Sequence, residues 1–229
     1  MPVIDEVKEQ HKKIKEQNFK TKLLYFLDYY KMHTIIVLAA IVTLCIFIIH
    51  VATEPKAPVI HALMLNGTPA EDTAELMHEF LTENGYNADD ESAYLEYGLS
   101  YTIGSTDNDT VSTMQKFLIM AQSGTLDFLI ANDTIIEYYS DQMLFYDLRD
   151  VLPSDMLQAY DKAGLLVYAQ MDPASSELAP VGIKGEAFPK LIATHAYDYE
   201  NANPVIAAIC TSPRTENMIQ FLNFLEQEN

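Results

Sequence analysis

The chain has 229 residues and a formal net charge of −19, and 49% of its residues are hydrophobic. The negative charge excludes nucleic acid and other polyanions as natural partners, because like charges repel. Two cysteines, Cys45 and Cys210, are too few for a disulfide framework, so the fold must depend on an apolar core.

The first strong feature is an apolar stretch at residues 34–52, which contains no Asp, Glu, Lys or Arg. A helix of this length rises about 28 Å, close to the roughly 30 Å hydrocarbon core of a bilayer. Seven lysines precede the stretch and only Lys56 follows within the next 20 residues, which predicts a cytoplasmic N-terminus. We therefore expect a single-pass anchor in the cell membrane, with the C-terminal part of the chain outside the cytoplasm.

The segments on either side of this stretch define the rest of the anchor. In residues 1–33, aromatic and aliphatic side chains recur at helical spacing beside lysines, which predicts a cytoplasmic amphipathic helical segment at the lipid headgroups. Residues 53–58 form the expected linker. A cleaved signal peptide is the alternative, but its positive segment is short and its cleavage site follows small residues, whereas here 33 residues precede the apolar stretch.

Residues 59–229 alternate between strand-like and helical patterns. The expected strands are residues 59–65, 95–103, 126–131, 165–170, 178–183 and 205–210. The expected helices are one capped by Thr68 and stopped at Gly85, one capped within 107–110 and ended by Gly124, two over 134–142 and 153–163, and one opened by Ser212 and Pro213. This alternation predicts one α/β domain with a doubly wound, mainly parallel sheet, because right-handed crossovers join such strands through helices.

Three segments carry a resemblance to a known family. Residues 123–127, read as Ser-Gly-Thr-Leu-Asp before a strand, and the Asp-Leu-x-x-x-Leu-Pro run at 147–153 resemble bacterial extracellular solute-binding proteins of ABC-type uptake systems. Residues 180–183 resemble a later strand of that family. The resemblance implies a periplasmic-binding-protein-like fold that recognises a solute. Members of the family have two lobes, whereas this chain has room for one, so it resembles a single-lobe, membrane-anchored relative of the kind found in Gram-positive bacteria.

Polar residues follow four of the expected strands. In open α/β sheets, ligands bind beyond the carboxyl ends of the strands, and helix N-termini there hold polar oxygens. The candidate ligand-binding residues are Asn66, Thr68, Ser105, Thr106, Asn132, Asp133, Thr211 and Ser212. The same residue types are ordinary helix caps, so a structural role is the alternative.

No catalytic pattern is present in the sequence. It lacks a Gly-x-Ser-x-Gly elbow, a His-Glu-x-x-His motif, a Cys-x-x-Cys pair and a Gly-rich phosphate loop. We expect no enzymatic activity, no cofactor and no metal site. The first hypothesis is a membrane-anchored extracytoplasmic binding module that recognises a small polar ligand or an envelope partner. The alternative is a structural or assembly protein that docks another membrane or surface protein without a small ligand.

Overall fold

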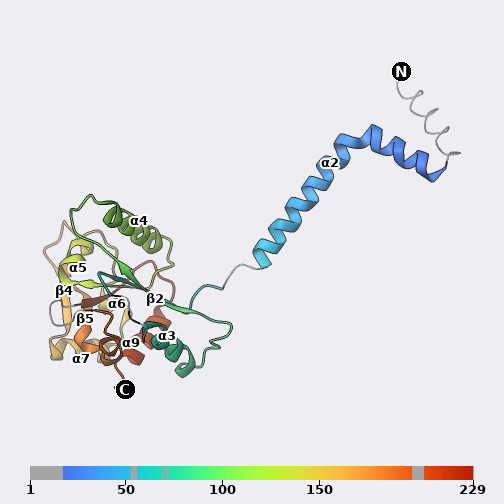
Figure 1. Ribbon diagram of the computed structural model, residues 1–229. Helices are drawn as coiled ribbons and strands as arrows, with labels where there is room; N and C mark the ends of the chain where they lie inside the picture. The colour runs from blue at the N-terminus through green and yellow to red at the C-terminus, as the bar shows by residue number, and fades with distance from the viewer. Residues whose placement is uncertain (1–17, 53–55, 69, 71, 198–203, 229) are drawn as a thin grey trace. The chain divides into compact units, whose positions relative to one another are not determined.

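The chain divides into two compact units, Met1–Pro55 and Lys56–Asn229. The computed structural model describes residues 18–52, 56–68, 70, 72–197 and 204–228, and of residues 21–23, 25–30, 34, 51 and 52 only the backbone (Figure 1). Most of the predicted amphipathic segment before the apolar stretch, residues 1–17, and half of the predicted linker, residues 53–55, lie outside the described residues.

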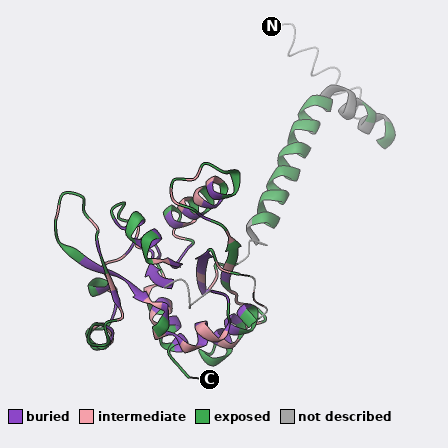
Figure 2. Cartoon of the chain, turned by 60° about the vertical axis from the view of Figure 1, so that its left-hand side comes forward, coloured by how far each residue is buried: buried purple, intermediate pink, exposed green. Residues whose placement is uncertain are grey.

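The first unit contains the long helix α2 (Phe19–Ala52). Its stretch Lys31–His50 is long and apolar enough to span a membrane, and none of it is buried within the chain (Figure 2). The Thr43 hydroxyl donates a 2.9 Å hydrogen bond to the Ala39 carbonyl, so this polar group is satisfied within the helix. Because α2 runs from Phe19 to Ala52, it contains both the predicted membrane crossing and the predicted interfacial residues after Asn18.

The second unit contains a six-stranded sheet with strand order β2-β1-β3-β6-β5-β4. The strands are β1 (Ile60–Leu65), β2 (Ala93–Leu99), β3 (Phe128–Asn132), β4 (Leu166–Gln170), β5 (Leu178–Lys184) and β6 (Pro204–Ala208). The helices are α3 (Asp72–Glu83), α4 (Asn108–Gln122), α5 (Asp133–Ser140), α6 (Leu148–Val151), α7 (Ser154–Ala163), α8 (Pro189–Ala193) and α9 (Thr215–Leu225), with the 3₁₀ turn η1 (Gly185–Ala187). The predicted α/β class is confirmed.

The sheet is mixed, which corrects the expectation of a mainly parallel one. Only the pairs β1·β2 and β1·β3 are parallel, whereas β3·β6, β5·β6 and β4·β5 are antiparallel. Only residues 171–177 separate β4 from β5, and a parallel crossover needs a dozen or more residues. The chain also leaves β5 and enters β6 at the same end of the sheet, since Lys184 pairs with Val205.

Strand β2 is shorter than predicted. It ends at Leu99, whereas the alternating pattern continues to Ile103. The pairing of β1 with β2 shifts between Leu63 and Leu65, and Gly98 has a φ of 75°, a conformation that glycine adopts without strain. This bulge turns the chain out of the sheet.

The sheet separates two apolar cores because side chains alternate between its faces. In β1, Ala62 and Met64 face α3 and α9, where the rings of Phe80 and Phe221 lie 5.1 Å apart at 83°. Leu63 and other residues of the opposite parity pack under α4 and α5. Figure 1 shows these two pairs of helices on opposite sides of the sheet, and Figure 2 shows the buried strands between them.

Candidate functional site

The parallel strands β1, β2 and β3 have their carboxyl ends at the same end of the sheet. This row of strand ends is here called the carboxyl edge, as distinct from the outer strands at the two sides of the sheet. Six of the eight predicted site residues follow these three strands. Asn66, directly after β1, has a φ of 59°. Its side-chain amide donates to the Tyr101 carbonyl at 2.9 Å, and its oxygen accepts from the Tyr101 N–H at 2.8 Å. Asn66 thus holds the loop that follows β2.

Thr68 does not cap α3 as predicted, because that helix begins only at Asp72. The Thr68 N–H instead donates to the Ala196 carbonyl at 2.8 Å, and its hydroxyl lies 3.4 Å from the His195 carbonyl oxygen. These contacts join the end of β1 to the segment that follows α8. Residues 69 and 71, between Thr68 and the start of α3, lie outside the described residues.

Ser105 and Thr106 lie in the loop before α4. The Ser105 hydroxyl donates to the Asp107 carboxylate, which caps α4 by accepting the Thr110 N–H at 2.8 Å. The hydrogen bonds from Ser105 and Thr110 lower the pKa of Asp107 to about 2. Thr106 is exposed beside them. This cluster serves the helix N-terminus.

Asn132 and Asp133 open α5. The Asn132 side chain accepts the Ile135 N–H at 3.0 Å, and the Asp133 carboxylate accepts the Thr134 N–H at 2.7 Å. Burial raises the pKa of the Tyr197 hydroxyl, and the Asp133 charge raises it further, although a hydrogen bond from the Asn132 backbone opposes the rise. Tyr197 is itself buried, and these interactions place it beside the start of α5.

Thr211 and Ser212 lie at the opposite end of the strands from the other six predicted site residues. They follow β6, which runs antiparallel to β3, so the end of β6 meets the start of β3. Thr211 donates its hydroxyl hydrogen bond to the Ala121 carbonyl at the end of α4. The expectation that all eight residues share one rim therefore fails for these two.

Ser212 belongs instead to a buried network around Asp127, which is fully buried just before β3. One Asp127 oxygen accepts the His61 N–H of β1 at 2.6 Å, and the other accepts the Ser212 hydroxyl. The Arg214 Nε donates to both oxygens at 2.9 and 3.0 Å. Burial raises the pKa of Asp127, whereas the hydrogen bonds from Ser212 and Arg214 oppose that rise.

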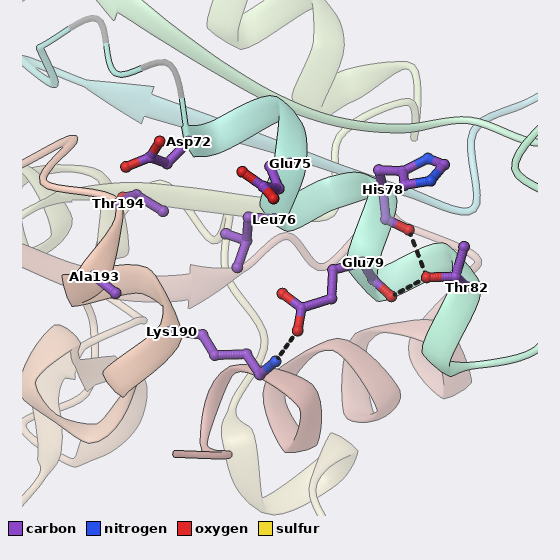
Figure 3. Close-up of a pocket in the computed structure, with 9 residues that line it drawn as sticks. All are labelled: Asp72, Glu75, Leu76, His78, Glu79, Thr82, Lys190, Ala193 and Thr194. Carbon is purple, nitrogen blue, oxygen red and sulfur yellow. Dashed lines mark hydrogen bonds and ion pairs between the residues drawn. The ribbon is translucent and has the colours of Figure 1, made fainter. Parts of the chain in front are cut away.

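A polar cavity of about 490 Å³ lies between α3 and α8 (Figure 3). Its lining residues are Asp72, Glu75, Leu76, His78, Glu79, Thr82, Lys190, Ala193 and Thr194. The Lys190 side chain is only 5% exposed, and its ammonium lies 2.6 Å from the Glu79 carboxylate and 3.9 Å from that of Glu83. The same ammonium lies 4.4 Å from the centroid of the Phe224 ring, which places it within cation–π distance.

The cavity suits a ligand that donates hydrogen bonds. Among the described residues Asp72 and Glu75 have no ion-pair partner, and their side chains line the cavity. Ionised carboxylates only accept hydrogen bonds. A signal for this site exists in the sequence, because Asp72, Glu75, Glu79 and Glu83 recur at intervals of three or four residues on one face of a helix. Lys190, the partner of Glu79 and Glu83, is distant in sequence, so only the fold brings it to them. Within the described ranges, no group of three or more His, Cys, Asp or Glu side chains is arranged to hold a metal ion.

A second hollow of about 400 Å³ runs between α3 and the edge strand β2 and is here called the edge groove. Its lining residues are Thr73, Ala74, Met77, His78, Leu81, Ser92, Ala93, Tyr94, Leu95 and Tyr97. Met77, Leu81 and Leu95 are buried apolar residues, whereas Tyr94 is 50% exposed and Tyr97 37% exposed. The groove therefore combines an apolar base with exposed aromatic rings.

Comparison with known proteins found no matching family model, no matching curated protein and no matching solved structure.

Replacing Asp127 by Asn should destabilise the domain by about 3–5 kcal/mol, because it leaves the mostly buried Arg214 without its counter-charge and turns an amide NH2 toward either the His61 N–H or the Ser212 hydroxyl. Urea unfolding of the full chain in detergent micelles, followed by the near-ultraviolet circular dichroism of its tyrosines, measures this loss. The control, Asp133→Asn, changes an exposed carboxylate and should stay within about 0.5 kcal/mol. A loss below about 1 kcal/mol for Asp127→Asn would contradict the structural role of the network.

Asp107 should make a pH-dependent contribution to stability. Because its pKa falls from 3.8 to about 2 on folding, the contribution is present above pH 3.8 and is lost as the pH falls toward 2. In Asp107→Asn the amide oxygen still caps α4 but does not titrate. The difference in melting temperature between the wild type and this variant should therefore change across that pH window, while the contributions of other carboxylates cancel. A constant difference would show that Asp107 is not stabilised in its ionised form.

Proposed function

We propose that the protein is a membrane-anchored extracytoplasmic binding module, similar to one lobe of a solute-binding protein, and that it recognises a small polar ligand in the cavity between α3 and α8. The observation that carries the proposal is the cavity itself, with carboxylates facing an open volume of about 490 Å³. Ligand pockets in proteins commonly have volumes of roughly 300–1,000 Å³. The chemistry of the lining favours a ligand with amine or hydroxyl groups.

The charge of the cavity supports this ligand class. Among the described lining residues, Lys190 is the only Lys or Arg, and it is already paired with Glu79 and Glu83. Asp72 and Glu75 therefore leave an excess of negative charge at the mouth. An amine would neutralise this charge, and hydroxyl groups would satisfy the carboxylate oxygens.

The anchor and its orientation form the second part of the proposal. The apolar helix provides the membrane attachment, and the lysines before it favour a cytoplasmic N-terminus. The second unit has its own cores on both faces of its sheet, so it needs no contact with the helix to bury its apolar residues. A tethered domain with its own cores suits recognition at the outer face of the membrane.

Docking of another membrane or surface protein, without a small ligand, is the second candidate function. The specific observation that favours it is the edge groove, because the edge strand β2 that lines it carries the exposed side chains of Tyr94 and Tyr97. Exposed aromatic residues are enriched in protein interfaces.

The orientation can be checked by cysteine labelling in intact cells. In a Cys210→Ser background, a cysteine introduced by Glu177→Cys should react with a membrane-impermeant maleimide, because Glu177 is 71% exposed in the turn between β4 and β5. A cysteine introduced by Lys8→Cys should react only after the membrane is permeabilised. The opposite pattern would place the domain in the cytoplasm and would refute the proposal.

The ligand can be sought by a thermal-shift screen of sugars, amino acids, peptides and amines on the full chain in detergent micelles. A true ligand at a hundredfold excess over its dissociation constant should stabilise the fold by about 2.7 kcal/mol. Glu75→Ala, in the cavity, should abolish the shift, whereas the matched change Glu137→Ala on the exposed surface of α5 should preserve it. No shift with any compound, or equal loss in both variants, would eliminate the cavity as the recognition site.

A further inference from the structure

Strand β2 forms one edge of the sheet, and within the described part of the chain it pairs only with β1. It is seven residues long, and its sequence contains neither Lys nor Pro, the residues that commonly protect an edge from pairing. The bulge at Gly98 interrupts the strand only near its end. The first five residues therefore offer a regular edge.

The backbone of β2 has unused hydrogen-bonding groups at alternate positions. The Ser92 carbonyl accepts the Val59 N–H at 2.8 Å, so at this position the strand faces β1. Since backbone groups alternate in direction along a strand, those of Ala93, Leu95 and Tyr97 point away from the sheet. These are three of the residues that line the edge groove.

Helix α3 forms the other wall of the groove. Ala74 is exposed and small, and Met77 and Leu81 lie beneath it as an apolar base. Figure 1 shows α3 and β2 side by side. A helix beside an open strand edge provides the two elements that bind extended peptides, because the strand pairs with the peptide backbone and the helix contacts alternate side chains.

The charge around the groove selects the kind of occupant. Asp90 and Glu91 lie just before β2, separated from it by Ser92, and Asp72 and Glu75 lie on the first turn of α3. Residues 53–229 contain 28 acidic and seven basic residues, so a second copy of the chain at this edge would meet strong repulsion. A basic segment would instead be attracted.

We propose that β2 and α3 bind an extended segment of a partner protein, which adds a strand to the sheet and carries apolar residues at alternate positions with Lys or Arg at its ends. The apolar side chains contact Ala74 and Met77, and the basic end beside the start of β2 meets Asp90 and Glu91. The proposal deepens the docking function and rests on it, but it does not depend on the small-ligand cavity.

The test uses synthetic peptides and the full chain in detergent micelles. Each peptide has seven central residues, to match β2, with Val or Leu alternating with Thr, and Lys at both ends. On binding, the amide protons of Ala93, Leu95 and Tyr97 should exchange with solvent at least about tenfold more slowly by nuclear magnetic resonance, while those of Tyr94 and Glu96 should not change. Peptides with Glu at both ends should bind at least about tenfold more weakly.

Ala74→Lys should weaken binding at least about tenfold, because the new side chain fills the groove and repels the basic peptide. The matched control is Ala159→Lys on the exposed face of α7, which should leave binding unchanged. Both changes are at exposed helix positions, so both variants should keep the wild-type melting temperature.

Three results would overturn the proposal. They are no alternating protection up to about 1 mM peptide, equal affinity for peptides ending in Lys and in Glu, and protection that appears without peptide as the protein concentration rises, which would identify a second copy as the occupant. If one of these results is obtained while a ligand of the α3–α8 cavity still gives a thermal shift, only the proposal for the edge groove is refuted. Cytoplasmic labelling of the domain would instead remove the proposed function.

Discussion

Asp127 is a fully buried carboxylate just before the central strand β3, and it receives hydrogen bonds from three donors in two separate parts of the chain. Its bond with the His61 N–H ties β3 to β1, and its bonds with Ser212 and Arg214 fix the start of α9. A buried charge is tolerated only with such partners, because an unpaired one costs several kcal/mol. The network therefore fixes the relative position of two strands and the last helix.

The position of α9 has consequences at the candidate cavity. The Phe221 and Phe224 rings of α9 pack against Phe80 of α3 at centroid distances of 5.1 and 5.5 Å. Phe224 also lies under the ammonium of Lys190, which pairs with Glu79. Contiguous contacts therefore connect the buried carboxylate at one edge of the sheet to the charged lining of the α3–α8 cavity.

The polar residues at the carboxyl edge differ from those of the cavity in how their side chains are used. The side-chain oxygens of Asn66, Asn132 and Asp107 accept hydrogen bonds from backbone N–H groups in loops and at helix starts. Asp72 and Glu75 instead face open volume. Capping residues are predictable from sequence because their partners lie within three residues. That same locality is why a polar residue after a strand is weak evidence for a ligand site.

The sequence by itself determined the features that depend on local order along the chain. These are the apolar helix, the α/β class, the six strands and five of the helices of the second unit to within a few residues, and the Asp107 and Asn132 caps, because side-chain periodicity and capping act over a few residues. The short helices α6 and α8 were not predicted. Only the tertiary structure decided the direction of β6, the separation of Thr211 and Ser212 from the other candidate residues, and the meeting of Lys190 with Glu79. The physical reason is that strand direction and ion pairing across 111 positions depend on which distant segments pack together.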